Sequence, residues 1–363
     1  MKTLEQLTTN AITLLKSLIE TPSFSGEENH TAALIIAWFT KYKIPYNKIN
    51  NNIWAVNKSF RETTSSVDKG KPTLLLNSHH DTVQPNKGYT KDPFKAIIED
   101  GKLYGLGSND AGGALVSLLA TFTYYYHRED LQYHLLFVAS AEEENSGPQG
   151  LHSILNQIPK IDVAIVGEPT NMQLAIAEKG LVVFDAVVKG TPSHAAHPNN
   201  NNAIYNTIEV LKWFQEYQFK KTSEVLGDVK MTVTQINAGI QHNAIPAEVN
   251  LVIDVRVNDA YSNQEICDIL ERESPCTQIT PRGTRLNSSS ISPAHVLVQA
   301  GISLGRKTYG SPTLSDQAIL TCPSLKLGPG ESKRSHTADE FIYIAEIEEA
   351  IQLYTALLEK AII

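Results

Sequence analysis

Acidic and imidazole side chains recur in this sequence at the ends of apolar segments, where they could bind metal ions or transfer protons. The stretch AEEENSGPQG follows the apolar run 133–140, so the consecutive glutamates Glu142, Glu143 and Glu144 stand where a buried strand should end. A solvated loop would explain this acidic run equally well. The other candidates of the same kind are His79, Asp81, Asp110, Glu168 and His336.

Each of these candidates has a plainer explanation when it is taken alone. His79 and Asp81 would be polar residues at a strand end, and Asp110 would cap the helix that follows the segment YGLGSND. Glu168 in GEPT and His336 in SHTADE would be turn residues. The joint pattern favours a metal site, because imidazole and carboxylate groups are both good ligands for zinc-type ions.

The number of candidates suits a pair of ions and a separate base. A shared carboxylate can hold two ions ~3.5–4 Å apart, the geometry that two-metal hydrolases use to activate water. A carboxylate beside the attacking water that does not bind the ions would act as general base. Adjacent glutamates would then have different tasks, one as ligand and the other as base.

The elements that must position these residues indicate an α/β fold with a mixed, mostly parallel sheet flanked by helices. Expected helices cover 4–20, 29–42 and 111–126, and expected buried strands cover 73–83, 133–140 and 163–170. Sites in such sheets lie beyond the carboxyl ends of the strands, and the polar clusters all fall there. Ser25 and Glu28 have the spacing of a capping box for the helix 29–42.

After about Glu178 the pattern changes to that of a second domain. Its expected elements are a strand at 181–190, a helix at 203–218, strands at 229–239 and 244–257, a helix at 263–273 and a strand at 276–280. The order β-α-β-β-α-β is that of a ferredoxin-like sandwich. We therefore predict a catalytic domain, residues 1–177 and 290–363, that is interrupted by an inserted α+β domain, residues 178–289.

Composition excludes several classes of protein. The 363 residues carry 31 basic and 39 acidic side chains without a long basic run, which argues against nucleic acid as a partner. The longest apolar run, 32–39, is too short to span a bilayer, so no membrane partner is expected. Cys267, Cys276 and Cys322 form no CxxC pair, and no signal-peptide pattern begins the chain. We expect a reduced, cytoplasmic protein.

Five sequence blocks occur in the order NSHHDTV, GLGSNDAGG, AEEENSG, VGEPT and SHTADE. Together they resemble the dinuclear zinc amidohydrolases and peptidases that include acetylornithine deacetylase, succinyl-diaminopimelate desuccinylase, aminoacylase and carboxypeptidase G. The resemblance covers nearly the whole chain and is greatest to the acetylornithine deacetylase branch. It implies a zinc exopeptidase-like catalytic domain with two Zn²⁺, for which Co²⁺ is an alternative, and an inserted lid domain that forms a homodimer.

The family pattern assigns roles to the candidates residue by residue. The ligands it implies are His79 and Glu168 for one ion, Glu144 and His336 for the other, and Asp110 as the bridge between the ions. Glu143 would be the general base, and Asp81 would orient His79 and fix its tautomer. Glu142 has no chemical role in this pattern. The family pattern, not periodicity, sets the register of base and ligand in the glutamate run.

The resemblance also implies substrate-binding and catalytic residues outside the metal site. His194 in KGTPSHAAHP would reach the neighbour's site in a dimer and stabilise the oxyanion, and His197 is the alternative for this role. A surface histidine on a loop would also explain His194. The candidates for binding the substrate are Asn243, Arg256, Thr313 and Ser315, with Asp316 beside them. An Arg suits a substrate carboxylate, although an ordinary ion pair would also explain Arg256, and a capped turn would explain the others.

The expected reaction is hydrolysis of the amide of a small-molecule N-acyl amino acid. N-acetylornithine, cleaved to ornithine and acetate in arginine biosynthesis, is the leading substrate. N-acetylcitrulline and N-succinyl amino acids, including succinyl-diaminopimelate, compete with it, and a dipeptidase or aminopeptidase is the second enzyme class. A metal-free binding or regulatory relative is the alternative of another class. The presence of all five ligands and Glu143 argues against it.

Overall fold

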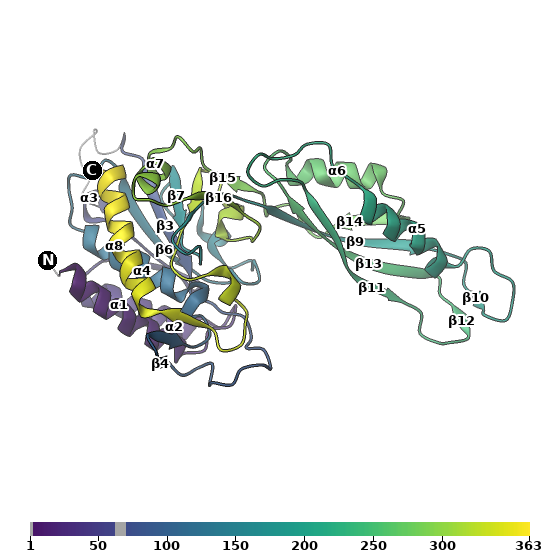
Figure 1. Ribbon diagram of the computed structural model, residues 1–363, viewed down its shortest axis with the longest axis horizontal. Helices are drawn as coiled ribbons and strands as arrows, with labels where there is room; N and C mark the ends of the chain where they lie inside the picture. The colour runs from purple at the N-terminus through teal and green to yellow at the C-terminus, as the bar shows by residue number, and fades with distance from the viewer. Residues whose placement is uncertain (1–2, 62–69) are drawn as a thin grey trace. The chain divides into compact units, whose positions relative to one another are not determined.

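The computed structural model describes residues 3–61 and 70–363, which form two compact units (Figure 1). Unit 1 comprises the described residues up to Ile176 together with Ile291–Tyr309 and Ser315–Ile363. Unit 2 comprises Ala177–Ser290 and Gly310–Leu314. Every helix in the described ranges is too short or too polar to cross a bilayer.

Unit 1 is built on a mixed sheet whose central strands are parallel, as the sequence predicts. The strand order is β1-β2-β6-β3-β7-β17-β8-β15, and β16 also pairs with β8. Strand β15 and the last two residues of β8 and of β16 belong to unit 2. Strands β6, β3, β7 and β17 run parallel, whereas β1, β2, β8 and β15 pair antiparallel. The bounds are β1 Asn47–Ile49, β2 Asn52–Val56, β3 Thr73–His79, β6 His134–Ser140, β7 Val163–Val166, β8 Leu174–Glu178, β15 Ser289–Ser290, β16 Thr308–Ser311 and β17 Ser324–Lys326.

Helices cover the sheet because its strands are apolar on both faces. Leu74 and Leu76 of β3 join the main core, while Leu75 joins a second cluster on the other face. The helix α4 is buried along nearly its whole length, as expected for a helix that is apolar all round. The helices of unit 1 are α1 Leu4–Ile19, α2 Asn29–Lys41, α3 Lys58–Arg61, α4 Gly113–Tyr125, α7 Val296–Ser303 and α8 Ile344–Ala361, with the single turns η2 Ser108–Gly112, η3 Leu151–Ile154, η4 Asp316–Ile319 and η5 Ser332–Arg334.

The parallel register brings the ends of three strands to one edge of the sheet. His79, the last residue of β3, lies opposite Ser140, the last residue of β6. Asn77 of β3 lies opposite Val166, the last residue of β7. The polar residues that follow these strands therefore emerge side by side. A small separate sheet consists of β4 Ile97–Glu99, β5 Lys102–Tyr104 and β18 Phe341–Tyr343. In the sequence, β5 comes shortly before Asp110 and β18 shortly after His336.

The predicted capping box at the start of α2 is wrong. The residue before α2 is Glu28, and no side chain caps the helix there. Ser25 instead donates to Asp81 Oδ2 at 2.7 Å, and Glu28 Oε1 accepts from the main-chain N–H of Gly26 at 2.6 Å. The local capping pattern is overridden because both side chains bind segments that surround the strand ends.

Unit 2 has a four-stranded antiparallel sheet in the order β11-β13-β9-β14. Its elements follow the chain as β9 Gly180–Lys189, α5 Ala203–Glu216, β11 Lys230–Ala238, β13 Glu248–Val257, α6 Asn263–Glu273 and β14 Gln278–Pro281. This is the β-α-β-β-α-β order of a ferredoxin-like sandwich. Buried residues alternate along β9 and β13, so one face of the sheet packs against the helices. A short antiparallel pair consists of β10 Ser193–His194, in the connection between β9 and α5, and β12 Ala244–Ile245, in the connection between β11 and β13.

Candidate metal centre

The five side chains predicted as metal ligands lie together at the carboxyl edge of the sheet in unit 1. His79 Nε2 is 3.4 Å from Asp110 Oδ1 and 3.7 Å from Glu168 Oε1. His336 Nε2 is 3.5 Å from Asp110 Oδ2 and 3.0 Å from Glu144 Oε2. Asp110 thus turns one carboxylate oxygen toward each histidine, which is the arrangement that a bridging ligand requires.

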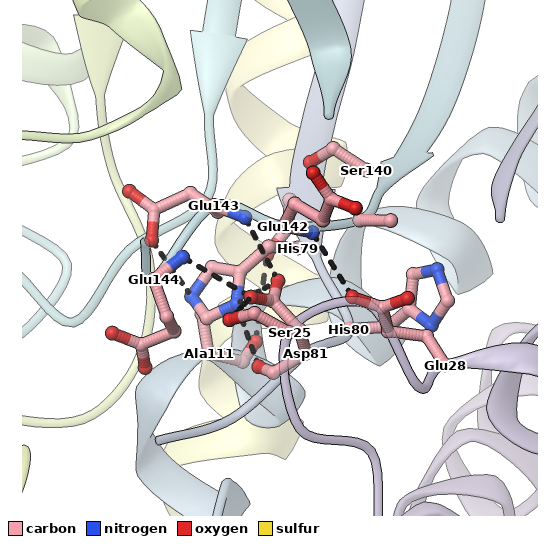
Figure 2. A network of polar contacts seen from close by, with 12 residues as sticks. Ser25, Glu28, His79, His80, Asp81, Ala111, Ser140, Glu142, Glu143 and Glu144 are labelled. Atoms are coloured by element: carbon pink, nitrogen blue, oxygen red, sulfur yellow. Dashed lines mark hydrogen bonds and ion pairs between the residues drawn. The ribbon is translucent and has the colours of Figure 1, made fainter. Parts of the chain in front are cut away.

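Glu143 lies within the same cluster. Its Oε2 atom is 4.0 Å from His79 Nε2, and His79, Glu143 and Glu168 together could hold an ion, as could His79, Asp110 and Glu144. Only Glu144 of the two glutamates bonds to His336 among the described contacts. Figure 2 shows Glu143 and Glu144 on the turn after β6, next to His79.

The donor atoms of this cluster fit divalent cations. Glu168 Oε1 is buried and has no hydrogen-bond partner in the part of the chain that the structure describes. An isolated buried carboxylate oxygen is costly, and a cation beside it would supply the missing partner. Two imidazoles and several carboxylates are also the ligand types that zinc takes. A candidate metal site is therefore present in this structure.

Crowding of acidic groups shifts the pKa values of the cluster. Burial raises the pKa of Glu168 to about 8, against the opposing effect of His79. Burial also raises the pKa of Glu143 well above its ordinary value and raises that of Glu144. The hydrogen bond to Glu144 raises the pKa of His336 to about 9. Bound cations would relieve the repulsion that these carboxylates exert on one another.

Asp81 forms hydrogen bonds with His79 and with the turn that carries the glutamates (Figure 2). His79 Nδ1 is 2.9 Å from the main-chain oxygen of Asp81, so an Nδ1–H donor there leaves Nε2 free for a cation. The carboxylate of Asp81 accepts from the main-chain N–H groups of Glu143 and Glu144, each at 3.1 Å. The main chain of this one buried residue therefore fixes a ligand histidine, and its side chain fixes the backbone of two acidic residues.

Glu142 takes no part in the cluster. Its backbone has φ 53°, its Oε2 accepts from Gln149 N–H at 2.9 Å, and its own N–H donates to Glu28 Oε1 at 3.2 Å. The side chain of Glu142 thus accepts a hydrogen bond from the loop that follows. The family pattern likewise gives Glu142 no chemical role.

Among the remaining candidates, His194, Asn243, Arg256 and Thr313 lie in unit 2. His194 is exposed and pairs with Ala244 of β12. The main-chain oxygen of Asn243, in the turn just before β12, accepts from Ala195 N–H at 2.9 Å, so Asn243 lies close to the His194 segment. Arg256 lies near the opposite end of β13, ~26 Å along the strand from its first residue. There it forms a bidentate pair with Asp254 at 2.9 and 3.0 Å. The ordinary ion pair therefore describes Arg256 in this structure.

Ser315 directly precedes η4, and Asp316 is the first residue of η4, both in unit 1, whereas Thr313 is part of unit 2. Ser315 accepts from Gln317 N–H at 3.3 Å, as a capped turn requires. Thr313 N–H donates to Ser311 Oγ at 3.3 Å. Asp316 is buried, accepts from Ser140 Oγ at 2.5 Å and has its pKa raised to about 6 by burial. Ser140 is the last residue of β6, shortly before the glutamate turn, so this bond places Asp316 near the cluster.

Sequence reasoning missed residues that are not proposed ligands but that form hydrogen bonds with the segments carrying the metal centre. The clearest are Ser25, Glu28 and Glu340, each of which binds a segment distant in the chain. Contacts of this kind leave no local spacing in the sequence. The only signal is that these residues fall in SGEE and SHTADEF, close to other site residues.

Comparisons with known proteins match most of the chain to one protein family. Residues 75–360 match the model of peptidase family M20/M25/M40. An acetylornithine deacetylase of Proteus mirabilis is 29% identical over 82% of this chain and 81% of that protein. A succinyl-diaminopimelate desuccinylase of Ruegeria sp. is 23% identical over 96% of this chain and 94% of that protein. The solved structure of a dinuclear metal-binding peptidase of the M20 family from Bacillus subtilis has a TM-score of 0.73 at 15% identity, covering 98% of each chain.

Proposed function

The chain belongs to peptidase family M20/M25/M40, and on that premise we propose that it is a two-metal hydrolase that removes the N-acyl group from an N-acylated amino acid. The observation that carries this proposal is the position of Asp110. Its two oxygens lie 3.4 Å and 3.5 Å from the Nε2 atoms of His79 and His336, which come from opposite ends of the sequence. A pair of cations that share one carboxylate explains this arrangement better than a solvated loop does.

The proposed ligands divide between two ions. His79 and Glu168 would hold one ion, Glu144 and His336 the other, and Asp110 both. Two zinc or cobalt ions bound there would polarise the scissile carbonyl and lower the pKa of a water molecule enough for attack near pH ~7.

The protein's own residues would move the protons. Glu143 would accept a proton from the attacking water and return it to the leaving nitrogen. Burial raises its pKa well above the ordinary value, which suits a carboxyl group that must both accept and donate near neutral pH. Asp81 would keep this base aimed by holding the N–H group of Glu143 at 3.1 Å.

N-acetylornithine is the substrate we propose first, with ornithine and acetate as products of a step in arginine biosynthesis. The similarity to an acetylornithine deacetylase at 29% identity supports it. The similarity to a succinyl-diaminopimelate desuccinylase at 23% identity supports an N-succinyl amino acid as second candidate. N-acetylcitrulline and a dipeptide complete the set, because the same ligands would serve each of them.

A substrate panel tests this assignment. The metal-loaded protein would be given N-acetylornithine, N-acetylcitrulline, N-succinyl-diaminopimelate and a dipeptide under identical conditions, and kcat/KM would be measured for each. We expect an N-acyl amino acid to be preferred by a wide margin. A dipeptide as best substrate would overturn the deacylase assignment while leaving the metal site intact.

We further propose that the protein acts as a homodimer through unit 2. Apolar side chains stand exposed on α5, where Tyr205 is 70% and Ile208 59% accessible. Ile236, on the edge strand β11, is 54% accessible. Exposed apolar groups of this kind on a helix and an edge strand suit pairing with a second copy. His194 would then stabilise the oxyanion in the site of that second copy.

A further inference from the structure

The buried carboxylate of Glu340, which is not among the proposed ligands, accepts hydrogen bonds from the loop that carries Asp110. Glu340 Oε1 accepts from the main-chain N–H groups of Asn109 at 2.8 Å and Asp110 at 2.9 Å, and its Oε2 accepts from Gly107 N–H at 3.2 Å. The main-chain oxygen of Glu340 accepts a further bond from Gly105 N–H at 3.0 Å. Glu340 is only 2% accessible.

The Asp110 loop needs such a partner. It forms the single turn η2 before α4, and the N–H groups at the start of a helical turn have no carbonyl partners within it. A carboxylate that accepts several N–H groups at a helix start is favoured by the charge-assisted bonds and by the helix dipole. The side chain of Asp110 faces the histidines, so it is not the group that satisfies these donors.

The same residue also joins two parts of the metal centre. Glu340 lies four positions after His336, whose backbone has φ 59° and is therefore held in a rarely populated conformation. On the other side of this segment, Asn109 bonds to the main chain of Glu331 and to Ser335 Oγ at 3.3 Å. The Asp110 loop and the His336 segment are thus fastened to each other through both Asn109 and Glu340.

We propose that Glu340 is a positioning residue of the metal centre, which sets the distance between Asp110 and His336 by holding the backbone of the Asp110 loop. The proposal rests on the two-metal site proposed above. Glu340 itself would touch neither the cations nor the substrate.

The test compares metal binding by the wild-type protein with that of E340Q and E340A. Each metal-free protein would be titrated with Co²⁺ against a competing chelator, and the visible absorption of the bound cobalt would be recorded, because its bands report ligand number and geometry. The matched control is D162N. Asp162 also accepts a main-chain N–H, that of Thr73 at 2.9 Å, but at the opposite end of β3, ~20 Å from His79 along the strand.

We expect E340A to bind cobalt ~10–100-fold more weakly, with altered absorption bands, as is usual when a group that orients metal ligands is lost. E340Q keeps one oxygen acceptor of the same shape, so its loss should be smaller; this variant decides the matter if E340A does not fold. D162N should keep wild-type cobalt affinity and bands. Wild-type affinity and bands in a folded E340Q and E340A, or an equal loss in D162N, would overturn the positioning role. A wild-type protein that binds no cobalt would instead overturn the proposed metal site itself.

Discussion

The three glutamates that follow β6 have the same side chain but different surroundings. The turn directs Glu142 toward the following loop, whereas Asp81 grips the N–H groups of the next two and holds both of them in the cluster. Glu144 bonds to His336, and Glu143 lies 4.0 Å from His79. The division of labour among them is therefore set by the backbone of the turn.

Replacing the proposed base should separate catalysis from metal binding. E143Q is expected to lower kcat by ~10²–10⁴-fold, since the proton would have no acceptor, while the metal content measured by mass spectrometry stays that of the wild type. E142Q, which changes the neighbouring acid, should keep most of its turnover. Similar losses in both variants would mean that the base has been assigned to the wrong residue.

Metal binding should release protons. Because the pKa of Glu168 is raised to about 8, this carboxyl group carries a proton in the metal-free protein below that pH, and a cation must displace it. Because His336, another proposed ligand, has its pKa raised to about 9 by its hydrogen bond to Glu144, metal affinity should rise with pH up to about 9 and level off above it. Calorimetric titration with zinc at pH 6.5 in two buffers of different ionisation enthalpy checks this. Identical heats in the two buffers would contradict it.

The central strands β3, β6 and β7 of unit 1 were predictable from sequence because they are buried on both faces and so appear as continuous apolar runs. The run 133–140 became β6 and the run from residue 73 became β3, with the site residues following each. The capping box predicted for α2 is absent, because Ser25 and Glu28 bind partners from other segments. Local spacing cannot report a competing partner that is distant in the chain.

Close packing between strand ends should make Gly328 intolerant of a side chain. A Cβ atom there would lie 2.5 Å from the main-chain oxygen of Glu168 and 3.0 Å from Ala114 Cβ. G328A is expected to lower the free energy of unfolding by ~1–3 kcal/mol and to weaken zinc binding, because Glu168 must move. Denaturant melts and zinc titration measure the two effects. G283A is the control, since no atom lies within 4 Å of its added Cβ; equal behaviour of the two variants would refute the argument.

The folded chain brings together side chains that are far apart in the sequence. Contacts between such side chains cannot be predicted from their spacing. His79 and His336 belong to one unit although unit 2 separates them in sequence. Their joint role could be proposed only because five blocks resemble one family, not from their spacing. The hydrogen bonds of Glu340 to the Asp110 loop join segments with a similar separation. They were not predicted, because the position of Glu340 in the block SHTADE does not indicate its partner.

The proposed homodimer makes a distinct prediction for the exposed face of unit 2. I208E places a charge on the apolar face of α5, where Ile208 is 59% accessible, and should convert the dimer to a monomer in light-scattering measurements. Zinc content should be unchanged, whereas turnover should fall if His194 serves the second copy. I98E, on an exposed apolar residue of unit 1, should leave the dimer intact. A wild-type protein that is monomeric throughout would refute the dimer.

Anomalous diffraction from crystals of the zinc-loaded protein would examine the metal assignment without relying on activity. Two zinc peaks are expected ~3.5–4 Å apart, one within ligand distance of His79 and Glu168, the other within ligand distance of Glu144 and His336, and Asp110 between them. Ligand bonds of ~2.0–2.2 Å would accompany these peaks. Zinc bound elsewhere on the protein, with no peak among these five side chains, would contradict the two-metal hydrolase.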